Sequence, residues 1–413
     1  MNYGLIGEKL GHSFSAEIHA MLGDYGYELK EIPADGLEQF IKDADFKGIN
    51  VTIPYKQAVI PYLDHLDTGA KAIGAVNTIV NKNGKLYGYN TDFFGMHSLL
   101  RRIGANPRGK KTLILGTGGT SKTALAVIKA MGGTEVYRVS RSSAEDAISY
   151  EEAVSLHSDA SIIINTTPVG MYPNTDACPI DINAFPQLTA VADAVYNPLR
   201  SRLIQAARAN NIPAEGGLFM LVAQAVRASE YFLGTLYDPQ TVTTVYQKML
   251  RKKENIVLIG MPSSGKSTVG DLLAAQFGRA CVDTDRVIEA NAGIKISRIF
   301  AEKGENAFRD IETATVAEVS RSGGVVIATG GGAVLREENL RALRQNGRLY
   351  FLDRPLEQLI PTEDRPLASS KEAIKTKYEE RYGIYTEAAD AIIENNGSAL
   401  EAAERIIKEF YAE

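Results

Sequence analysis

The sequence predicts an α/β protein in which parallel strands alternate with helices. Short apolar runs typical of buried strands recur along the chain, at residues 49–53, 112–115 and 255–259 among others, and amphipathic stretches with helical periodicity lie between them. Two of these runs lead directly into glycine-rich loops that begin at Gly116 and Gly260 and are followed by helical patterns. The order strand, glycine-rich loop, helix is typical of α/β folds that bind phosphate groups at helix N-termini.

Composition limits the class of protein. The chain has 413 residues, 45% of them hydrophobic and 23% charged, which predicts two to four folded domains and argues against disorder. With 45 Lys and Arg against 50 Asp and Glu, the net charge is −5, and nucleic acid is not an expected partner because a basic surface is missing.

No run of about 18 apolar residues and no signal peptide is seen, so we expect no membrane association. The two cysteines, Cys178 and Cys281, have neither disulfide-framework nor zinc-site spacing, which fits a cytoplasmic protein. The oligomeric state stays open.

Composition shifts predict the domain boundaries. A first α/β segment covers residues 1–101, and a βαβ series begins after it and runs to about residue 217. The helical stretch 218–250 ends in the charged residues 251–254, which we interpret as a linker. A fresh strand at 255–259 then opens a further α/β domain that extends to residue 413.

The loop at residue 260 matches the pattern GxxxxGK[ST] between a predicted strand and a predicted helix. In such loops backbone N–H groups surround phosphate oxygens, the lysine adds a charge to the outer phosphates, and the hydroxyl that follows binds Mg²⁺. A purely structural glycine turn would leave Lys266 and Ser267 unexplained. The motif therefore predicts a site for ATP and Mg²⁺ formed by Gly260, Ser263, Ser264, Gly265, Lys266, Ser267 and Thr268.

Two carboxylates follow the next predicted strand. Asp283 and Asp285 are two residues apart, so their side chains lie on one face of the strand end. One can hold Mg²⁺ and the other a substrate hydroxyl. The alternative is that they are turn-forming residues without a role in chemistry.

Five motifs together make residues 255–413 resemble shikimate kinases, with a fold similar to nucleoside monophosphate kinases around a parallel sheet. They are the loop at 260, Asp283-Thr284-Asp285, Phe308-Arg309-Asp310-Ile311-Glu312, Gly330-Gly331-Gly332 and Arg365-Pro366-Leu367. The resemblance implies that Arg309, oriented by Glu312, and Arg381 clamp the shikimate carboxylate. It also implies that Asp285 holds the attacking hydroxyl, Gly330 to Gly332 let the backbone approach the ring, with Gly331 and Gly332 as substrate-binding residues, and Arg365 reaches the transferred phosphoryl group. We assign the metal contact to Asp283 together with Ser267. Two departures are that Ser263 stands where the family has glycine, and that the stretch between Leu352 and Arg365 is short.

A dinucleotide-type turn lies between the strand at 112–115 and the next helix. It contains Gly116, Gly118, Gly119, Thr120 and Ser121, as in Rossmann-type domains. The second strand of this unit ends at Ser140 and Arg141 without an acidic residue. A cation there favours the 2′-phosphate of NADP over the free ribose of NAD, unless Arg141 is an ordinary surface charge.

The first 250 residues resemble shikimate dehydrogenases. The motifs are His12-Ser13-Phe14-Ser15, the stretch 48–56, Gly74-Ala75-Val76-Asn77-Thr78, Asn90-Thr91-Asp92 and the helix 217–225. The resemblance joins residues 218–250 to the substrate domain 1–101 and makes residues 102–217 the Rossmann-type NADP domain. It implies that Ser13 and Ser15 bind the substrate carboxylate, and that Thr52, Asn77 and Gln224 bind ring hydroxyls. Lys56 beside Asp92 would donate a proton to, and polarise, the carbonyl that is reduced.

The two resemblances predict consecutive reactions on one chain. The first is NADPH-dependent reduction of 3-dehydroshikimate to shikimate, and the second is ATP- and Mg²⁺-dependent phosphorylation of shikimate to shikimate 3-phosphate. An alternative is a quinate/shikimate dehydrogenase fused to a degenerate nucleotide-binding regulatory module. Activity on quinate with NAD, or ATP binding without phosphorylation, would favour that alternative.

Overall fold

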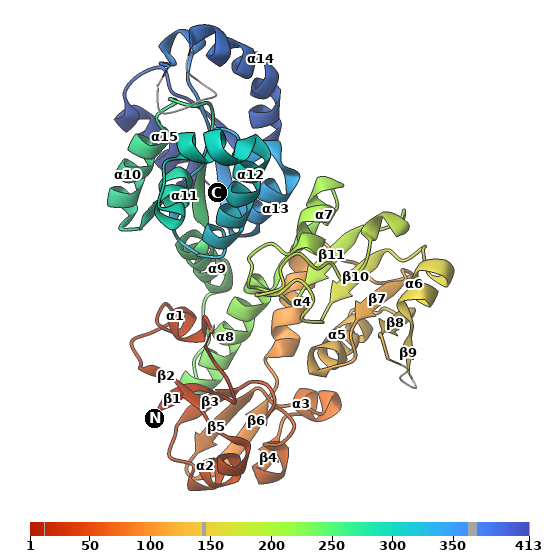
Figure 1. The fold of residues 1–413 in the computed structure, drawn as a ribbon. Coiled ribbons are helices and arrows are strands. Elements are labelled where there is room, and N and C mark those ends of the chain that lie inside the picture. Colours follow the sequence, from red (N-terminus) through yellow and green to blue (C-terminus); the bar gives the residue numbers. More distant parts are fainter. Residues whose placement is uncertain (12, 143–145, 362–369, 413) are drawn as a thin grey trace. The chain divides into compact units, whose positions relative to one another are not determined.

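The computed structural model describes residues 1–11, 13–142, 146–361 and 370–412. The chain divides into two compact units, Met1–Met249 and Leu250–Glu413 (Figure 1). Among the residues described, no helix is long and apolar enough to cross a membrane.

The first sheet of the N-terminal unit is mixed and has the strand order β2-β1-β3-β5-β6-β4. β1 pairs in parallel with both β2 and β3, whereas β3 and β5 are antiparallel. Ile6, Ile49 and Ile79 form part of its core. The elements of this lobe are β1 (Tyr3–Gly7), α1 (Ser15–His19), β2 (Tyr27–Glu31), η1 (Ala34–Gly36), α2 (Leu37–Asp43), β3 (Gly48–Val51), η2 (Ile60–Tyr62), β4 (His65–Leu66), α3 (Thr68–Ile73), β5 (Thr78–Lys82) and β6 (Lys85–Tyr89).

The second sheet of this unit is parallel throughout, with the order β12-β11-β10-β7-β8-β9. Its central strands β7, β10 and β11 are buried along their whole length, which explains their continuous apolar sequences. The elements are β7 (Thr112–Leu115), α5 (Gly119–Ala130), β8 (Val136–Val139), β9 (Ala147–Ile148), α6 (Tyr150–Leu156), β10 (Ile162–Asn165), η3 (Ile182–Ala184), β11 (Ala190–Asp193), α7 (Arg202–Ala209) and β12 (Ala214–Glu215).

Two long helices connect the sheets of the N-terminal unit. α4 (Asp92–Arg102) packs on α8 (Gly217–Leu233), and the contact is so close that a Cβ atom added to Gly95 would lie 2.6 Å from the carbonyl oxygen of Met220. The predicted helical stretch 218–250 is two helices, because Gly234 ends α8 with φ 65°. α9 (Thr241–Lys253) follows. The segment 251–254, interpreted from the sequence as a linker, is thus helical through Lys253, where three cations suit the negative end of a helix.

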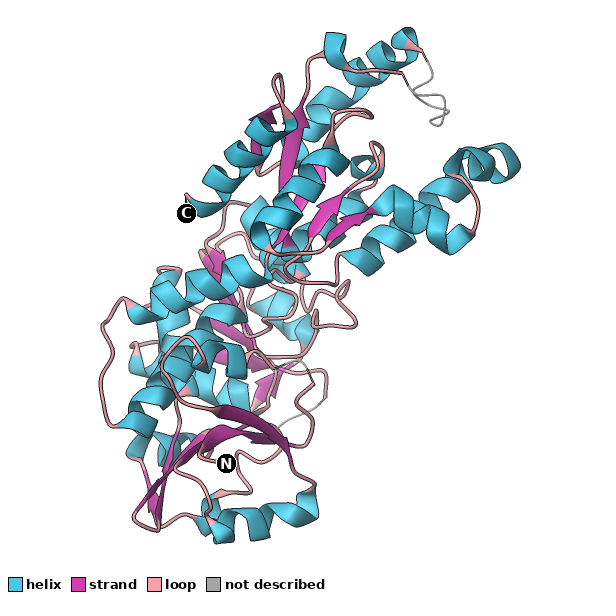
Figure 2. Ribbon diagram, turned by 90° about the vertical axis from the view of Figure 1, so that its left-hand side faces the viewer, coloured by secondary structure: helices cyan, strands magenta, loops and turns pink. Residues whose placement is uncertain are grey.

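The C-terminal unit contains a parallel five-stranded sheet with the order β14-β15-β13-β16-β17. Helices flank its strands in Figure 2. Alternate residues of β13 enter two separate cores, Val257 and Ile259 on one face and Ile256 and Leu258 on the other, so both faces are covered. The elements are β13 (Asn255–Ile259), α10 (Lys266–Phe277), β14 (Cys281–Asp283), α11 (Thr284–Ala292), α12 (Ile296–Val319), β15 (Val326–Ala328), η4 (Ala333–Leu335), α13 (Glu337–Asn346), β16 (Gly347–Asp353), η5 (Leu356–Gln358), α14 (Lys371–Ala388), β17 (Ala391–Glu394) and α15 (Ala399–Tyr411).

Candidate active sites

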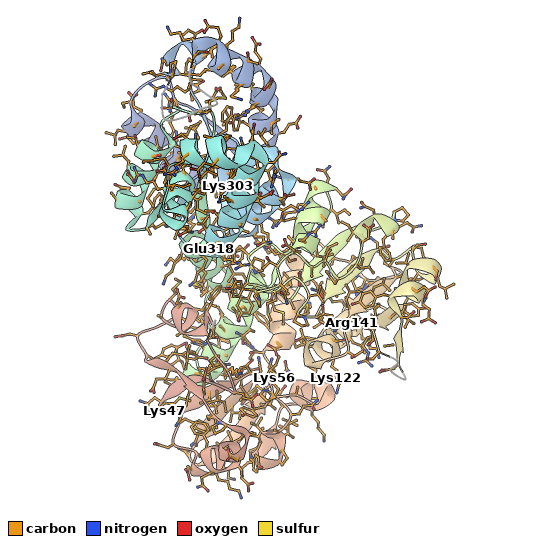
Figure 3. All side chains as sticks on the ribbon, in the orientation of Figure 1. Lys47, Lys56, Lys122, Arg141, Lys303 and Glu318 are labelled. Carbon is orange, nitrogen blue, oxygen red and sulfur yellow. The ribbon has the colours of Figure 1, made fainter. Side chains whose placement is uncertain are left out.

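A lysine and an aspartate form an ion pair in the N-terminal unit. Lys56 lies in the loop after β3 (Figure 3), Asp92 is the first residue of α4, and Nζ of Lys56 donates to Oδ2 of Asp92 at 2.5 Å. The other carboxylate oxygen accepts a hydrogen bond of 2.9 Å from the amide of Asn77. The side chains of Lys56 and Asp92 are 24% and 14% exposed. The carboxylate therefore holds an ammonium group that still reaches solvent, as a proton donor requires.

Hydrogen bonds join Asn77 to helices α4 and α8. Oδ1 of Asn77 accepts from the backbone N–H of Thr91 at 2.7 Å, and the Thr91 hydroxyl donates to Oε1 of Gln224 at 3.2 Å. Asn77, Thr91 and Gln224 are all buried. The amide groups of Asn77 and Gln224 are thereby oriented before any substrate binds.

Strand topology brings the serine and threonine candidates to the same edge of the sheet. Ser13 follows β1 and Thr52 follows β3, and these strands are parallel neighbours whose carboxyl ends coincide. The backbone N–H of Val51 donates to the carbonyl oxygen of Asn77, which puts Asn77 at this edge as well. Ser15 begins α1, and its backbone N–H donates to Oγ of Ser13 at 3.2 Å.

The turn after β7 leaves the N-terminus of α5 open. Gly116 has φ 108°, and a Cβ atom there would lie 2.9 Å from Oγ1 of Thr166, so only glycine fits without strain. Among the residues that the structure describes, a Cβ atom added to Gly118 or Gly119 would meet nothing within 4 Å, and no side chain caps this helix end. Ser121 is fully buried, while Thr120 lies in the first turn. The open, uncapped N–H groups fit a pyrophosphate.

Arg141 lies beyond the carboxyl end of β8, on the lobe that holds β7 to β9 (Figure 3). Its side chain is exposed, and no ion pair with it is found in the described part of the chain. The Oγ atoms of Ser140 and Ser142 are 3.3 Å apart beside it. Because β7 and β8 are parallel neighbours, Ser140 and Arg141 lie at the same sheet edge as the glycine turn, where a 2′-phosphate would be expected.

In the C-terminal unit, the phosphate loop has three residues in the left-handed region or beyond it. Gly260 has φ 144°, Ser263 has φ 64° and Gly265 has φ 89°. Lys266 is buried, and its Nζ donates to the carbonyl oxygens of Gly260 at 2.9 Å and Met261 at 2.8 Å. The curled backbone holds the ammonium group directly beneath the loop, where phosphate oxygens would be bound.

A hydroxyl and a carboxylate suited to Mg²⁺ are already in contact. Oγ of Ser267 donates to Oδ2 of Asp283 at 2.6 Å, and Oδ1 of Asp283 accepts from the backbone N–H groups of Asp285 and Arg286 at the start of α11. Hard oxygen donors of this kind fit Mg²⁺. They open into a polar cavity of about 180 Å³ lined by Ser263, Gly265, Lys266, Ser267, Thr268, Asp283, Asp285, Thr329 and Gly331.

Two buried arginines surround the glycine triplet. Nη1 of Arg309 binds Oε2 of Glu312 at 2.6 Å, and a Cβ atom on Gly332 would collide with the Arg309 guanidinium. Nη1 of Arg381 donates to the carbonyl oxygen of Gly331 at 3.2 Å. Burial raises the pKa of Glu312, and the charge of Arg309 opposes that shift. The structure thus brings together Arg309, Arg381, Gly331 and Gly332, while Arg365 lies outside the described residues.

Comparison with known proteins identifies the N-terminal unit. Residues 5–79 match the family model described as shikimate dehydrogenase substrate binding domain. A shikimate dehydrogenase (NADP(+)) of Clostridium perfringens is 37% identical over 265 residues, which cover 60% of this chain and 97% of that protein. The chain belongs to the shikimate dehydrogenase family.

Solved structures agree with this family assignment. A shikimate dehydrogenase of Peptoclostridium difficile is 35% identical, with a TM-score of 0.55, and covers 60% of this chain and 98% of its own. The enzyme of Thermus thermophilus, solved in complex with NADP(H) and shikimate, is 29% identical with a TM-score of 0.54, covering 60% of this chain and 99% of its own. Beyond this dehydrogenase part, residues 262–411 match the family model described as shikimate kinase.

Two residues that orient candidate site groups were not predicted from the sequence. Thr91 links Asn77 to Gln224 in the shikimate dehydrogenase unit. Tyr385 in the C-terminal unit is fully buried, and its hydroxyl donates to the same carbonyl oxygen of Gly331 that Arg381 binds. Thr91 lies inside the motif Asn90-Thr91-Asp92, whereas Tyr385 could have been found only from its helical spacing of four residues from Arg381.

Proposed function

We propose that this chain catalyses two consecutive steps, NADPH-dependent reduction of 3-dehydroshikimate to shikimate and ATP-dependent phosphorylation of shikimate to shikimate 3-phosphate. The observation that carries the proposal is that one chain combines the Lys56–Asp92 pair with a phosphate loop joined to Asp283 through Ser267. The product that the first site would release is the acceptor that the second would use. The family matches of both parts support this assignment.

In the reductive step, NADPH supplies the hydride. Lys56 would donate a hydrogen bond and then a proton to the carbonyl oxygen as negative charge develops there. Asp92 holds the ammonium in position, and Asn77 fixes the carboxylate from its other side. Ser13 and Ser15 would bind the substrate carboxylate, and Thr52, Asn77 and Gln224 its hydroxyls. Ser140 and Arg141 would bind the 2′-phosphate of the cofactor.

In the kinase step, ATP supplies the phosphoryl group, and Mg²⁺ would be held by Ser267 and Asp283. Lys266 would neutralise charge on the outer phosphates once it leaves the loop carbonyls that it now contacts. Asp285 would accept the proton of the attacking hydroxyl, while Arg309 and Arg381 bind the carboxylate at the far side of the ring. Because these roles are mainly positional and electrostatic, the arrangement of buried charges determines the rate.

The proposal extends to domain organisation and location. We assign substrate binding for the reduction to residues 1–101 with 218–250, NADP binding to residues 102–217, and the kinase to residues 255–413. We further propose a cytoplasmic location, which is supported by the two free cysteines, Cys178 and Cys281.

A coupled assay on the full chain tests the function. Purified protein is mixed with 3-dehydroshikimate, NADPH, Mg²⁺ and ATP, and NADPH loss is followed together with formation of shikimate 3-phosphate. Lys56→Ala should slow NADPH loss by at least about 10²-fold yet leave phosphorylation of added shikimate intact, whereas Asp285→Asn should let shikimate accumulate. ATP binding by the wild type without any phosphorylation of shikimate would instead indicate a regulatory nucleotide domain.

A further inference from the structure

One face of α14 is buried but carries a lysine. Ile374, Arg381, Tyr385 and Ala388 are the buried residues of this helix, each at most 6% exposed. Lys377 is three residues after Ile374 and four before Arg381, so helical geometry puts it on the same face. Its side chain is half-buried. A lysine in such a stripe is unusual unless an anion offsets its charge.

The charged neighbours of Lys377 are two arginines and two glutamates. Burial and the charge of Arg381 lower the pKa of Lys377, with a smaller contribution from Arg309, while Glu305 and Glu380 act in the opposite direction. Arg381 and Glu380 are on α14, and Arg309 and Glu305 are on α12. Helical spacing puts Lys377 one turn before Arg381, whose Nη1 donates to the carbonyl oxygen of Gly331, and the Arg309 guanidinium lies against the next residue, Gly332.

Two acids of α12 bind Arg309. Glu312 binds Nη1 of Arg309 at 2.6 Å, and Oε1 of Glu305 lies 3.1 Å from its Nη2. For the ammonium of Lys377, neither a hydrogen bond nor an ion pair is found within residues 1–11, 13–142, 146–361 and 370–412. Lys375, two positions earlier, is 65% exposed and lies 3.9 Å from Glu379 on the outer face. Lys377 thus differs from an ordinary solvated lysine of the same helix.

We propose that Lys377 is the third cation of the carboxylate subsite formed with Arg309 and Arg381, and that it determines the affinity of the kinase unit for a carboxylate-bearing cyclic polyol. This rests on the proposed kinase function. The carboxylate is remote from the hydroxyl that reacts, so the interaction would be equal in the ground state and the transition state. Such uniform binding affects KM but not kcat.

The test uses the full chain and initial rates of ADP release at saturating ATP, with shikimate varied. For Lys377→Met we expect a KM for shikimate raised by about tenfold, as for loss of one charge at a few ångströms in a partly screened site. We expect kcat and the KM for ATP to change by less than about twofold, and Lys377→Arg to restore most of the affinity. Lys375→Met is the matched control and should behave as the wild type.

Two further readouts separate a binding role from a structural one. Raising ionic strength should increase the KM for shikimate more in the wild type than in Lys377→Met, because the variant has lost one screened charge. Thermal unfolding should show Lys377→Met about as stable as the wild type, since the described residues make no hydrogen bond or ion pair with the ammonium that the variant would lose.

Specific outcomes would overturn the proposal. An unchanged KM for shikimate in Lys377→Met would do so, and so would equal increases in the KM for shikimate and ATP or a drop in stability that Lys375→Met does not share. If the wild type itself fails to phosphorylate shikimate, the proposed kinase function falls first, and this result is distinguishable because it requires no variant.

Discussion

Nζ of Lys56 and Oδ2 of Asp92 are 2.5 Å apart, although 36 residues separate them in the sequence. The loop after β3 positions the lysine, and the amide of Asn77 holds the Asp92 carboxylate at the start of α4. Both side chains retain contact with solvent. We therefore expect the pair to contribute little to stability, and we propose that its geometry serves the reduction.

Replacing either partner should therefore reduce catalysis without unfolding the protein. We expect Lys56→Ala to lower kcat for 3-dehydroshikimate reduction by about 10² to 10⁴-fold, the range for loss of a general acid. The free energy of unfolding should change by less than about 1 kcal/mol. Steady-state NADPH oxidation and urea denaturation measure the two quantities. Lys47→Met, at an exposed lysine of the same lobe (Figure 3), is the control, and a comparable loss of kcat in that variant would contradict the assignment.

The stability of the N-terminal unit should depend on pH through His19. His19 is completely buried, lies 2.6 Å from the Tyr25 hydroxyl through Nδ1 and stacks on Tyr27 with ring centroids 3.8 Å apart. Burial lowers the pKa of His19 to about 3 from 6.5. Below pH 6.5 the unfolded chain therefore takes up a proton that the folded chain does not, and folding stability is lost as the pH falls.

We expect the free energy of unfolding to fall by about 2 kcal/mol between about pH 6.5 and about pH 5 because of this residue. In His19→Phe this part of the pH dependence should disappear, even if the variant is less stable at neutral pH. His65→Phe, at an exposed histidine that also stacks on a tyrosine, should retain it. Urea denaturation at a series of pH values measures the effect, and parallel curves for the wild type and His19→Phe would refute it.

Ser263 has a positive φ, a backbone conformation that residues other than glycine rarely adopt. Its φ of 64° is unfavourable for a residue with a Cβ atom, and its Oγ donates to the carbonyl oxygen of Ile360 at 2.8 Å. Ser263→Ala keeps the strain and loses the hydrogen bond, whereas Ser263→Gly loses both. We therefore expect Ser263→Ala to be less stable than Ser263→Gly by about 1 kcal/mol. At most positions the order is the reverse, because glycine loses more conformational freedom on folding than alanine. Chemical denaturation measures the free energy of unfolding of the two variants. A more stable Ser263→Ala would show that the positive φ does not disfavour a side chain at this position.

Asp283 combines a helix cap with a proposed metal contact, and the two roles can be separated. Asp283→Ser keeps a side-chain oxygen that can accept from the first N–H groups of α11, but it removes the carboxylate charge. We expect a loss of less than about 1 kcal/mol in stability and a rise of at least about tenfold in the Mg²⁺ concentration that gives half-maximal kinase rate. Titration of Mg²⁺ at fixed ATP measures the Mg²⁺ requirement, and urea denaturation measures the change in stability. An unchanged Mg²⁺ requirement would remove Asp283 from the metal site.

Local sequence patterns were sufficient for both glycine-rich turns. β7 and β13 are continuous apolar runs because parallel strands are buried on both faces, and the positive φ values at Gly116 and Gly265 require glycine. Helix ends were less predictable. The stretch 218–250 reads as one helix, but Gly234 divides it, and α9 continues through Lys253. A single glycine within a helical pattern does not by itself reveal a left-handed C-cap.

What the sequence by itself determined is the identity of the chemical groups and the order of strands and helices, because backbone preferences and hydrophobic periodicity act over only a few residues. Tertiary structure decided which groups meet. Asn77 and Gln224 are 147 residues apart yet both contact Thr91. Arg309 on α12 and Arg381 on α14 likewise meet at Gly331 and Gly332. Such contacts depend on strand order and helix packing, which no local pattern encodes.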